Sequence, residues 1–185
     1  MFDQTSDDQD MIDAYFNIIE QRILEPIRRT DVRLYCTATL LLLFAAIDGL
    51  GKLLHPEDKA RSNERIRGFL DYMGGDYEVR KGELLKLRHS LVHNAINVES
   101  FLSQTELGRD EHLKKIGAAG FIYVNTVGMH RDVEDAFRRF RADIEHDPAL
   151  FKRAAKRLEW KEENLVDHLD IAATPPPPVG FIWAK

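Results

Sequence analysis

The chain has 185 residues, of which 44% are hydrophobic and 31% are charged, and its formal net charge is −5. This length and balance are typical of a single globular domain with a substantial core, and they exclude a disordered chain. The acidic balance argues against a general nucleic-acid coat, which carries a broad excess of Lys and Arg, but it leaves room for a local basic cleft.

The cysteine content and the apolar runs indicate a reducing compartment and no membrane segment. A single cysteine, Cys36, excludes a disulfide framework and is interpreted as a small buried hydrophobe. The N-terminal stretch MFDQTSDDQD is acidic and polar, without signal or transit character. The longest apolar run, Leu34 to Ile47, falls short of the ~20 residues that a membrane span needs. We therefore expect a cytoplasmic protein.

Apolar spacing predicts the first two helices. From Met11 to Leu24, apolar residues recur every three or four positions, which indicates an amphipathic helix, and Pro26 should end or kink it. A second helix should start near Thr30 or Asp31, either of which can cap it, and run to about residue 54. Because its segment LLLLFAAI is apolar on nearly all sides, we expect this helix at the centre of the fold.

Proline, glycine and aspartate place the next two helices. Pro56 is expected to open a third helix that ends at Gly74 and Gly75, a natural left-handed stop. Asp76 can cap a fourth helix. The apolar face expected for this fourth helix consists of Val79, Leu84, Leu87, Leu91 and Val92.

The second half of the chain changes character twice. Residues 96–120 contain β-branched and alternating stretches around Gly108, which predict a short hairpin. Helical periodicity returns from about Val124 and runs to about residue 144. Asp147 and Pro148 should then cap a last helix. That helix is expected to carry Phe151, Leu158, Leu165 and Leu169.

These elements predict an all-α fold: a bundle of five or six helices with a small β-hairpin after the fourth helix. Residues 1–170 would form one helical domain. Residues 171–185 would form a Pro-rich C-terminal tail, because TPPPPVG favours polyproline II structure. The ending FIWAK is too apolar to stay in water, so we expect it to pack on the domain or on a partner chain.

The stretch LRHSLVHNA, residues 87–95, is the only part of the sequence that looks like a catalytic or binding site. His89 and His93 are four residues apart and share one helical face, a spacing used by paired metal ligands. A zinc site needs further ligands, and the segment has neither the glutamate of H-E-x-x-H nor a cysteine pair. Metal binding by these two histidines is therefore one alternative.

Arg88 and His93 form a second constellation. Five steps of ~100° place them about 140° apart around an ideal helix, too far for one narrow groove. They can line a wider cleft where two such helices meet, which predicts a homodimer with each chain contributing its pair. The alternative is that both side chains cap the negative end of the helix. Burying two cationic donors among leucines is costly without a partner, which favours a functional role.

The segment RHSLVHN resembles the R-x4–6-H signature of HEPN domains (higher eukaryotes and prokaryotes nucleotide-binding). Arg88 matches the arginine, His89 the polar position after it, and His93 the histidine. The likeness extends loosely over residues 10–165 and implies a HEPN-like helical bundle. It also implies a homodimeric, metal-independent endoribonuclease that needs no cofactor, as in toxin, anti-phage defence and RNA-processing members. Other members are inactive modules that bind RNA, nucleotide or a protein partner.

The resemblance also bears on regulation. Some toxin members carry a tyrosine two residues after the histidine, where a nucleotidyltransferase antitoxin modifies it. In this chain Ala95 occupies that position, which puts regulation by that route in doubt. An antitoxin or another regulatory protein remains an expected partner, and a membrane is not.

RNA cleavage without metal uses the ribose 2′-hydroxyl as nucleophile, and it needs a base, an acid and a cation for the phosphorane oxygens. We expect His93 to transfer protons and Arg88 to hold phosphate oxygens in a fork. His89 would orient the phosphate or assist proton transfer, and Asn94 would donate a hydrogen bond.

Three further charged features have two interpretations each. The stretches RRFR at 138–141 and KRAAKR at 152–157 are either solvated faces or a track for RNA. Asp48 lies inside the apolar helix, where a buried carboxylate needs a cation. It would pair with Arg88 or cap a neighbouring helix.

Overall fold

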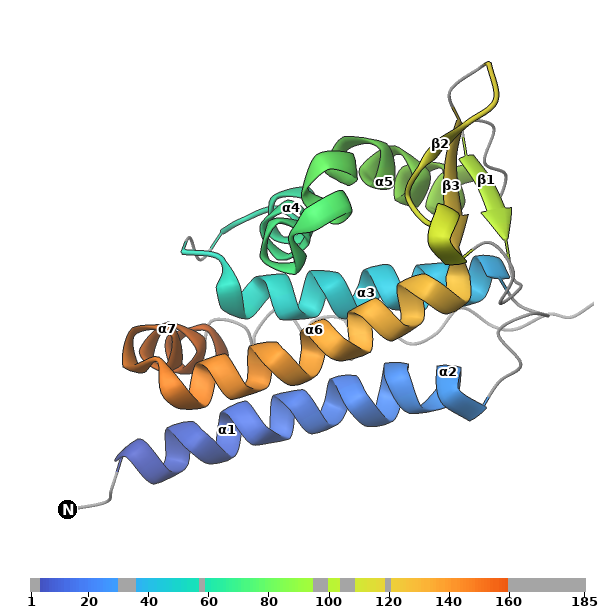
Figure 1. Cartoon of the computed structure of the whole chain (residues 1–185). Coiled ribbons are helices and arrows are strands. Elements are labelled where there is room, and N and C mark those ends of the chain that lie inside the picture. Colours follow the sequence, from blue (N-terminus) through green and yellow to red (C-terminus); the bar gives the residue numbers. More distant parts are fainter. Residues whose placement is uncertain are drawn as a thin grey trace, which may run out of the picture.

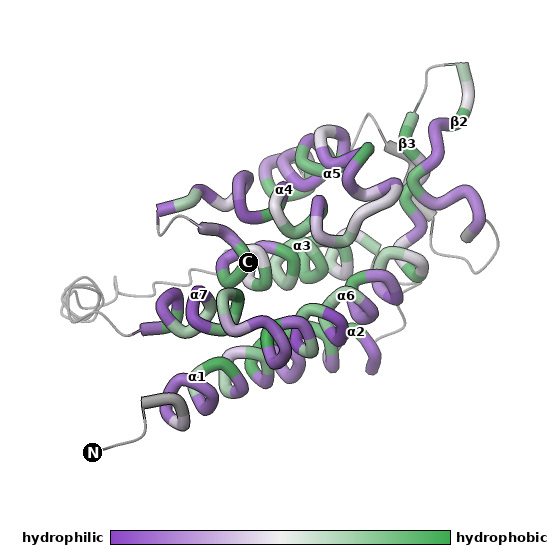
Figure 2. The backbone as a smooth tube through the Cα atoms, turned by 60° about the vertical axis from the view of Figure 1, so that its left-hand side comes forward, coloured by the Kyte–Doolittle hydropathy of each residue, from purple (hydrophilic) through white to green (hydrophobic). Residues whose placement is uncertain are grey.

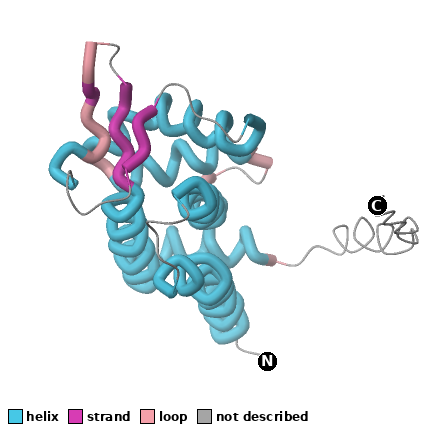
Figure 3. Tube along the Cα trace, turned by 90° about the vertical axis from the view of Figure 1, so that its right-hand side faces the viewer, coloured by secondary structure: helices cyan, strands magenta, loops and turns pink. Residues whose placement is uncertain are grey.

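The computed structural model describes residues 4–29, 36–56, 59–94, 100–103, 109–118 and 121–159. Its helices form an all-α bundle with a small sheet at one end, as the sequence predicts (Figures 1 and 3). The central helix α3 lies between α1 and α6 on one side and α4 and α5 on the other (Figure 1). The principal helices are α1 (Gln4–Ile19), α3 (Cys36–Leu54), α4 (Ser62–Met73), α5 (Gly75–Asn94), α6 (Thr126–His146) and α7 (Pro148–Leu158).

The first helix does not end at Pro26. It passes from α1 through a π-helical turn, η1 (Glu20–Leu24), into a short helix, α2 (Glu25–Arg29). In the π turn the amide of Glu25 donates to the carbonyl of Glu20, five residues back. This wider turn ends two residues before Pro26, whose missing amide and bulky ring strain a regular α-helix. The chain therefore remains helical to Arg29.

Helix α3 is the core of the protein. Ten of its residues are buried, including Cys36, which confirms both the central position and the interpretation of the cysteine as a small hydrophobe. Its expected start at Thr30 or Asp31 lies outside the described residues. In Figure 2, α3 carries mainly hydrophobic residues. By length and composition, this 19-residue helix is the only one in the described part that suits a membrane, yet half of its apolar window is buried within the bundle.

Helix α4 begins later than expected, at Ser62 and not at Pro56. Arg61 precedes the helix, and its amide donates to the Glu64 carboxylate at 2.6 Å, so a side chain inside the first turn defines the start. The expected end is confirmed: Gly74 follows Met73 with φ of +74°, a conformation that glycine adopts without strain.

Helix α5 starts at Gly75, one residue before the expected cap, so Asp76 lies inside the first turn. The predicted apolar face holds only in part, because Leu84, Leu87 and Leu91 are buried. Val79 and Val92 are 66% and 51% exposed. Each is five residues from a buried leucine, which places it about 140° around the helix and away from the core.

The sheet contains more than the predicted hairpin. Its strands are β1 (Ser100–Ser103), β2 (Lys115–Ile116) and β3 (Phe121–Asn125), in the order β1-β3-β2, and a 3-10 turn, η2 (Arg109–Glu111), precedes β2. The antiparallel hairpin is β2–β3, so it turns after residue 116 and not around Gly108, which lies outside the described residues. Strand β1 pairs with β3 in parallel.

Strand β3 leads directly into α6. Asn125 ends the strand and caps the helix, because its side-chain oxygen accepts the amide of Gly128 at 2.8 Å. Val124 therefore belongs to the strand and not, as expected, to the helix. The buried residues of α6 pack toward α3, which joins the sheet end of the molecule to the core.

The last helix, α7, starts as predicted. Asp147 caps it by accepting the amides of Ala149 and Leu150, and Pro148 occupies the first helical position. The helix ends at Leu158. The predictions for 165 and 169, for the domain end at 170 and for the tail at 171–185 lie outside the described residues.

Candidate active site

The motif RHSLVHN occupies the C-terminal half of α5. Leu87 and Leu91 are buried beneath it, and His89 and His93 are exposed. Leu87 and Leu91 thus anchor the helix to the core, while Val92 and the two histidines are exposed. Asn94 is the last residue of α5, and the orientation of its side chain lies outside the described part of the protein.

The two histidines form a pair. Their ring centroids are 4.4 Å apart and the ring planes are tilted by 53°. This confirms that the four-residue spacing places both imidazoles on one face of the helix. Apart from this mutual contact, neither ring has a hydrogen bond or ion pair with any described residue. Both rings are therefore open to a ligand from solvent.

Arg88 faces α4. The half-buried guanidinium donates from Nη2 to the Ser62 hydroxyl at 3.1 Å, and from Nη1 to the Asn63 side-chain oxygen at 3.5 Å. No described hydrogen bond or ring contact joins it to His89 or His93. Within one chain, the structure thus brings the two histidines together and keeps the arginine on the neighbouring face, as the helical angle requires.

Asp48 has a cationic partner, but that partner is Arg65 and not Arg88. Arg65 donates from Nε and Nη2 to the two carboxylate oxygens, at 2.7 and 2.9 Å, a forked ion pair between α3 and α4. This hydrogen bonding raises the pKa of Arg65 above its usual value. The Ser62 hydroxyl donates to Asp48 at 2.9 Å and also accepts from Arg88. Asp48 therefore reaches Arg88 through one hydroxyl group.

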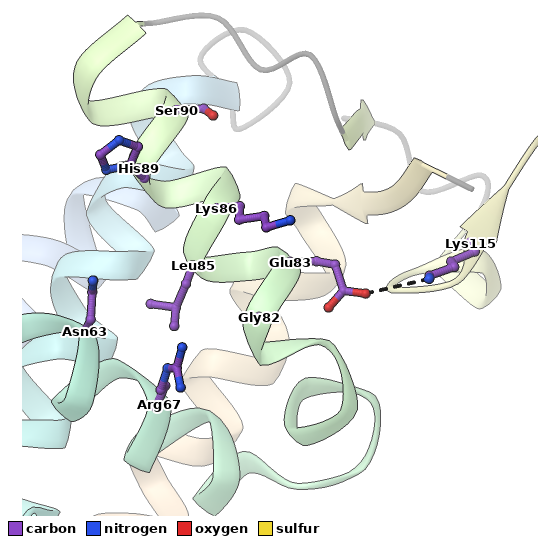
Figure 4. A pocket seen from close by; sticks show the side chains of 9 residues that line it. All are labelled: Asn63, Arg67, Gly82, Glu83, Leu85, Lys86, His89, Ser90 and Lys115. Atoms are coloured by element: carbon purple, nitrogen blue, oxygen red, sulfur yellow. Dashed lines mark ion pairs between the residues drawn. The ribbon is translucent and has the colours of Figure 1, made fainter. Parts of the chain in front are cut away.

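A groove of about 790 Å³ lies along the exposed face of α5 (Figure 4). Asn63 and Arg67 of α4 border one side, and Lys115 of β2 borders the other. His89 lies at the same surface, so the groove reaches the histidine pair. Asn63 belongs to the groove and also accepts from Arg88, which places the arginine beside the same surface.

A metal centre finds no support in the described ranges. They contain no group of three or more His, Cys, Asp and Glu side chains placed to hold a metal ion. Within that part of the chain, His89 and His93 thus lack the further ligands that a protein zinc site uses.

Sequence reasoning missed a partly buried chain of polar side chains near the start of α5. The Tyr77 hydroxyl donates to Asp132 and lies 2.9 Å from Nε2 of His112, whose Nδ1 accepts the amide of Asn125 at 2.9 Å. These partners assign the ring proton to Nε2, which then donates to the phenol oxygen. Burial, aided by the Asp132 carboxylate, raises the pKa of Tyr77 well above its usual value.

These polar contacts tie α5 to α6 and to the loop before β2, and they border a smaller cavity of about 360 Å³. Tyr77, His112 and Asp132 are separated by 20 residues or more, and no local pattern joins them. The sequence therefore carried no signal that they meet.

The arginines of the two basic stretches are engaged within the chain. Arg138 pairs with Asp135, and Arg141 donates to Asp13 at 2.8 Å. Arg153 and Arg157 donate to the carbonyl groups of residues 54 and 55, where they satisfy the C-terminal end of α3. These contacts favour a structural role for these arginines over a track for RNA.

No protein-family model, curated protein or solved structure matches this chain. The resemblance to HEPN domains therefore depends on residues 88–94 and on the helical fold.

Proposed function

We propose that this protein is a metal-independent endoribonuclease of HEPN type. The observation that supports the proposal best is the exposed imidazole pair of His89 and His93, 4.4 Å apart, on the helix that also carries Arg88. Imidazole is the side chain that exchanges protons most readily near neutral pH. Two such rings, together with a guanidinium on the neighbouring face of the same helix, are the kinds of group that can serve as the base, the acid and the cation in RNA cleavage.

In the proposed reaction, one imidazole takes the proton of the ribose 2′-hydroxyl as its oxygen attacks the adjacent phosphorus. The bond from phosphorus to the 5′-oxygen of the next nucleotide breaks, and the second imidazole gives that oxygen a proton. The products are a 2′,3′-cyclic phosphate and a 5′-hydroxyl. We assign proton transfer to His93, with His89 as its partner and Asn94 as a further hydrogen-bond donor.

Arg88 stabilises the charge that develops on the phosphorane oxygens in this proposal. A guanidinium has five N–H donors, and two of its nitrogens contact Ser62 and Asn63. The contact with Asn63, at 3.5 Å, is long, so it costs little to exchange for a phosphate oxygen.

The active form in this proposal is a homodimer. Arg88 and His93 lie on different faces of α5, so a second copy would complete the set of groups around one phosphodiester. Val92, 51% exposed beside His93, offers apolar surface for such a contact. The proposal includes a cytoplasmic location, a toxin or anti-phage defence role, and an antitoxin or other regulatory protein as partner.

Cleavage of total RNA and tRNA in the presence of EDTA tests the proposal. We expect products with 2′,3′-cyclic phosphate ends, and we expect His93→Ala and Arg88→Ala each to lower the rate about 10²-fold or more. His146→Ala and Arg138→Ala are the matched controls, because both residues are exposed on α6 away from the motif. Cleavage that EDTA abolishes, or that survives His93→Ala, would refute the assignment.

A mixing experiment tests the shared site. If each active site uses groups from two copies, a mixture of the inactive Arg88→Ala and His93→Ala proteins recovers part of the activity, because some heterodimers contain one intact site. A mixture that exchanges subunits and stays inactive contradicts a composite site.

The second candidate function is a catalytically silent, HEPN-like dimer that binds RNA, nucleotide or a protein partner. The engagement of Arg88 by Ser62 and Asn63 favours it, since a structural arginine is not available to a phosphate. A stable dimer that binds RNA and leaves total RNA and tRNA intact would support this function.

A further inference from the structure

The groove along α5 concentrates positive charge on an otherwise acidic protein. Its lining includes the cations Arg67, Lys86 and Lys115 and a single carboxylate, Glu83, whereas the whole chain has a net charge of −5. The carboxylate lies 3.9 Å from Lys115 and 3.6 Å from Arg80, so two cations already share it. Such exposed pairs are weak, and the described lining has three cations and this one carboxylate.

The cations come from three separate elements and border the groove on both sides. Arg67 projects from α4, Lys86 from α5 and Lys115 from β2 (Figure 4). Arg67 has no hydrogen bond or ion pair with any residue in the described part of the chain, so its guanidinium can accept an anion without losing a partner there. Arg138 and Arg141 differ from Arg67 in this respect, because each already has a carboxylate partner.

Gly82 of α5 lines the groove and is exposed. A methyl group added there would meet no atom within 4 Å, so the space above this glycine is open. A glycine in a helix interior costs about 0.5–1 kcal/mol relative to alanine, and here the missing side chain widens the groove. Asn63 and Ser90 add neutral polar groups to the lining, and no described lining residue is Phe, Tyr or Trp.

We propose that this groove binds the phosphate backbone of single-stranded RNA, on the segment next to the bond that is cleaved. The proposal builds on the ribonuclease function above. Cations on both sides of a groove whose described lining has no Phe, Tyr or Trp suit a phosphate backbone more than stacked bases. Because His89 lines the groove and contacts His93, a strand held there leads to the imidazole pair.

The groove belongs to one chain, unlike the composite site proposed above. Its binding can therefore be measured separately from cleavage, with an oligoribonucleotide whose 2′-hydroxyls are methylated. That probe keeps the phosphate charge and lacks the nucleophile. Its affinity for the wild-type protein, followed by fluorescence anisotropy over a range of salt concentrations, should fall steeply as salt rises.

Two kinds of variant test the groove. Arg67→Ala and Lys115→Ala should each weaken binding and reduce the salt slope by about 0.7, the value for one phosphate contact on a single strand. Gly82→Glu should weaken binding about tenfold or more, because it fills the open space and reverses the local charge. The new glutamate would lie four residues before Lys86, an arrangement that stabilises a helix, so this variant should fold.

Arg138→Ala is the control, because Arg138 is exposed on α6 outside the groove, and it should bind the probe like the wild type. Unchanged binding by Gly82→Glu, with wild-type cleavage of ordinary RNA, overturns the groove and leaves the ribonuclease in place. Loss of binding in the groove variants, with a wild-type protein that cleaves nothing, supports the groove and refutes the ribonuclease. A wild-type protein that ignores the probe at low salt, or that prefers a duplex of the same sequence, overturns the groove proposal.

Discussion

Replacing Gly51 by alanine should test how α3 and α4 position the candidate site. Gly51 is buried where the two helices cross, and a methyl group there would lie 2.7 Å from the carbonyl carbon of Arg65 and still closer to its oxygen. This obstacle is backbone, so a rotamer change cannot relieve it. Helix α4 must therefore move. That helix carries Arg65, which pairs with Asp48. It also carries Ser62, which donates to Asp48 and accepts from Arg88.

The expected cost follows from two opposing effects. In a helix interior, alanine is more stable than glycine by about 1 kcal/mol. Overpacking a core, by contrast, costs about 1–3 kcal/mol and sometimes more. Because the clash is deep and involves backbone, we expect Gly51→Ala to lower the free energy of unfolding by about 2 kcal/mol or more. For a protein of this size, that corresponds to a fall in Tm of about 4–8 °C.

Circular dichroism melts and urea titrations measure this change, and Gly82→Ala is the matched control. Both glycines lie inside helices, but the space above Gly82 is open. The control should gain about 0.5–1 kcal/mol of stability. If Gly51→Ala is as stable as Gly82→Ala, the close crossing of α3 and α4 is wrong, and so is the placement of Arg88 that depends on it.

Three further predictions concern charged and titrating groups. Asp48→Asn should lower the free energy of unfolding by about 1–3 kcal/mol in urea titrations, because it weakens the forked pair with Arg65; an unchanged midpoint contradicts the pair. Burial and the hydrogen bond to Asp143 raise the pKa of Tyr72 to about 12. The native protein should therefore lose stability as pH rises from about 10 toward 12, and Tyr72→Phe should reduce that loss in alkaline melts. Burial lowers the pKa of His130, so stability should fall as pH drops below about 6.5, and a His130→Gln protein with the same acid slope refutes this.

Local signals in the sequence were reliable where one short segment contains both partners of an interaction. Asp147 caps α7 by contacting amides two and three residues ahead, and Gly74 ends α4 by its own backbone conformation. The predicted start of α4 was wrong, because its segment contains two possible helix starts. Pro56 is a residue type that favours a helix start. The helix nevertheless begins at Ser62, because there the Glu64 carboxylate accepts the amide of Arg61.

In the candidate site, too, local geometry could be predicted from the sequence, whereas contacts between distant elements could not. The sequence by itself determined that His89 and His93 share a face, because four residues nearly match one helical turn. It also determined that Asp48, inside an apolar helix, needs a cation. Only the tertiary structure decided that Arg65 is that cation, that β1 runs parallel to β3, and that α4, α5 and β2 border one basic groove. These features join residues far apart in the chain, and their partners are selected by the packing of whole elements, which no local pattern records.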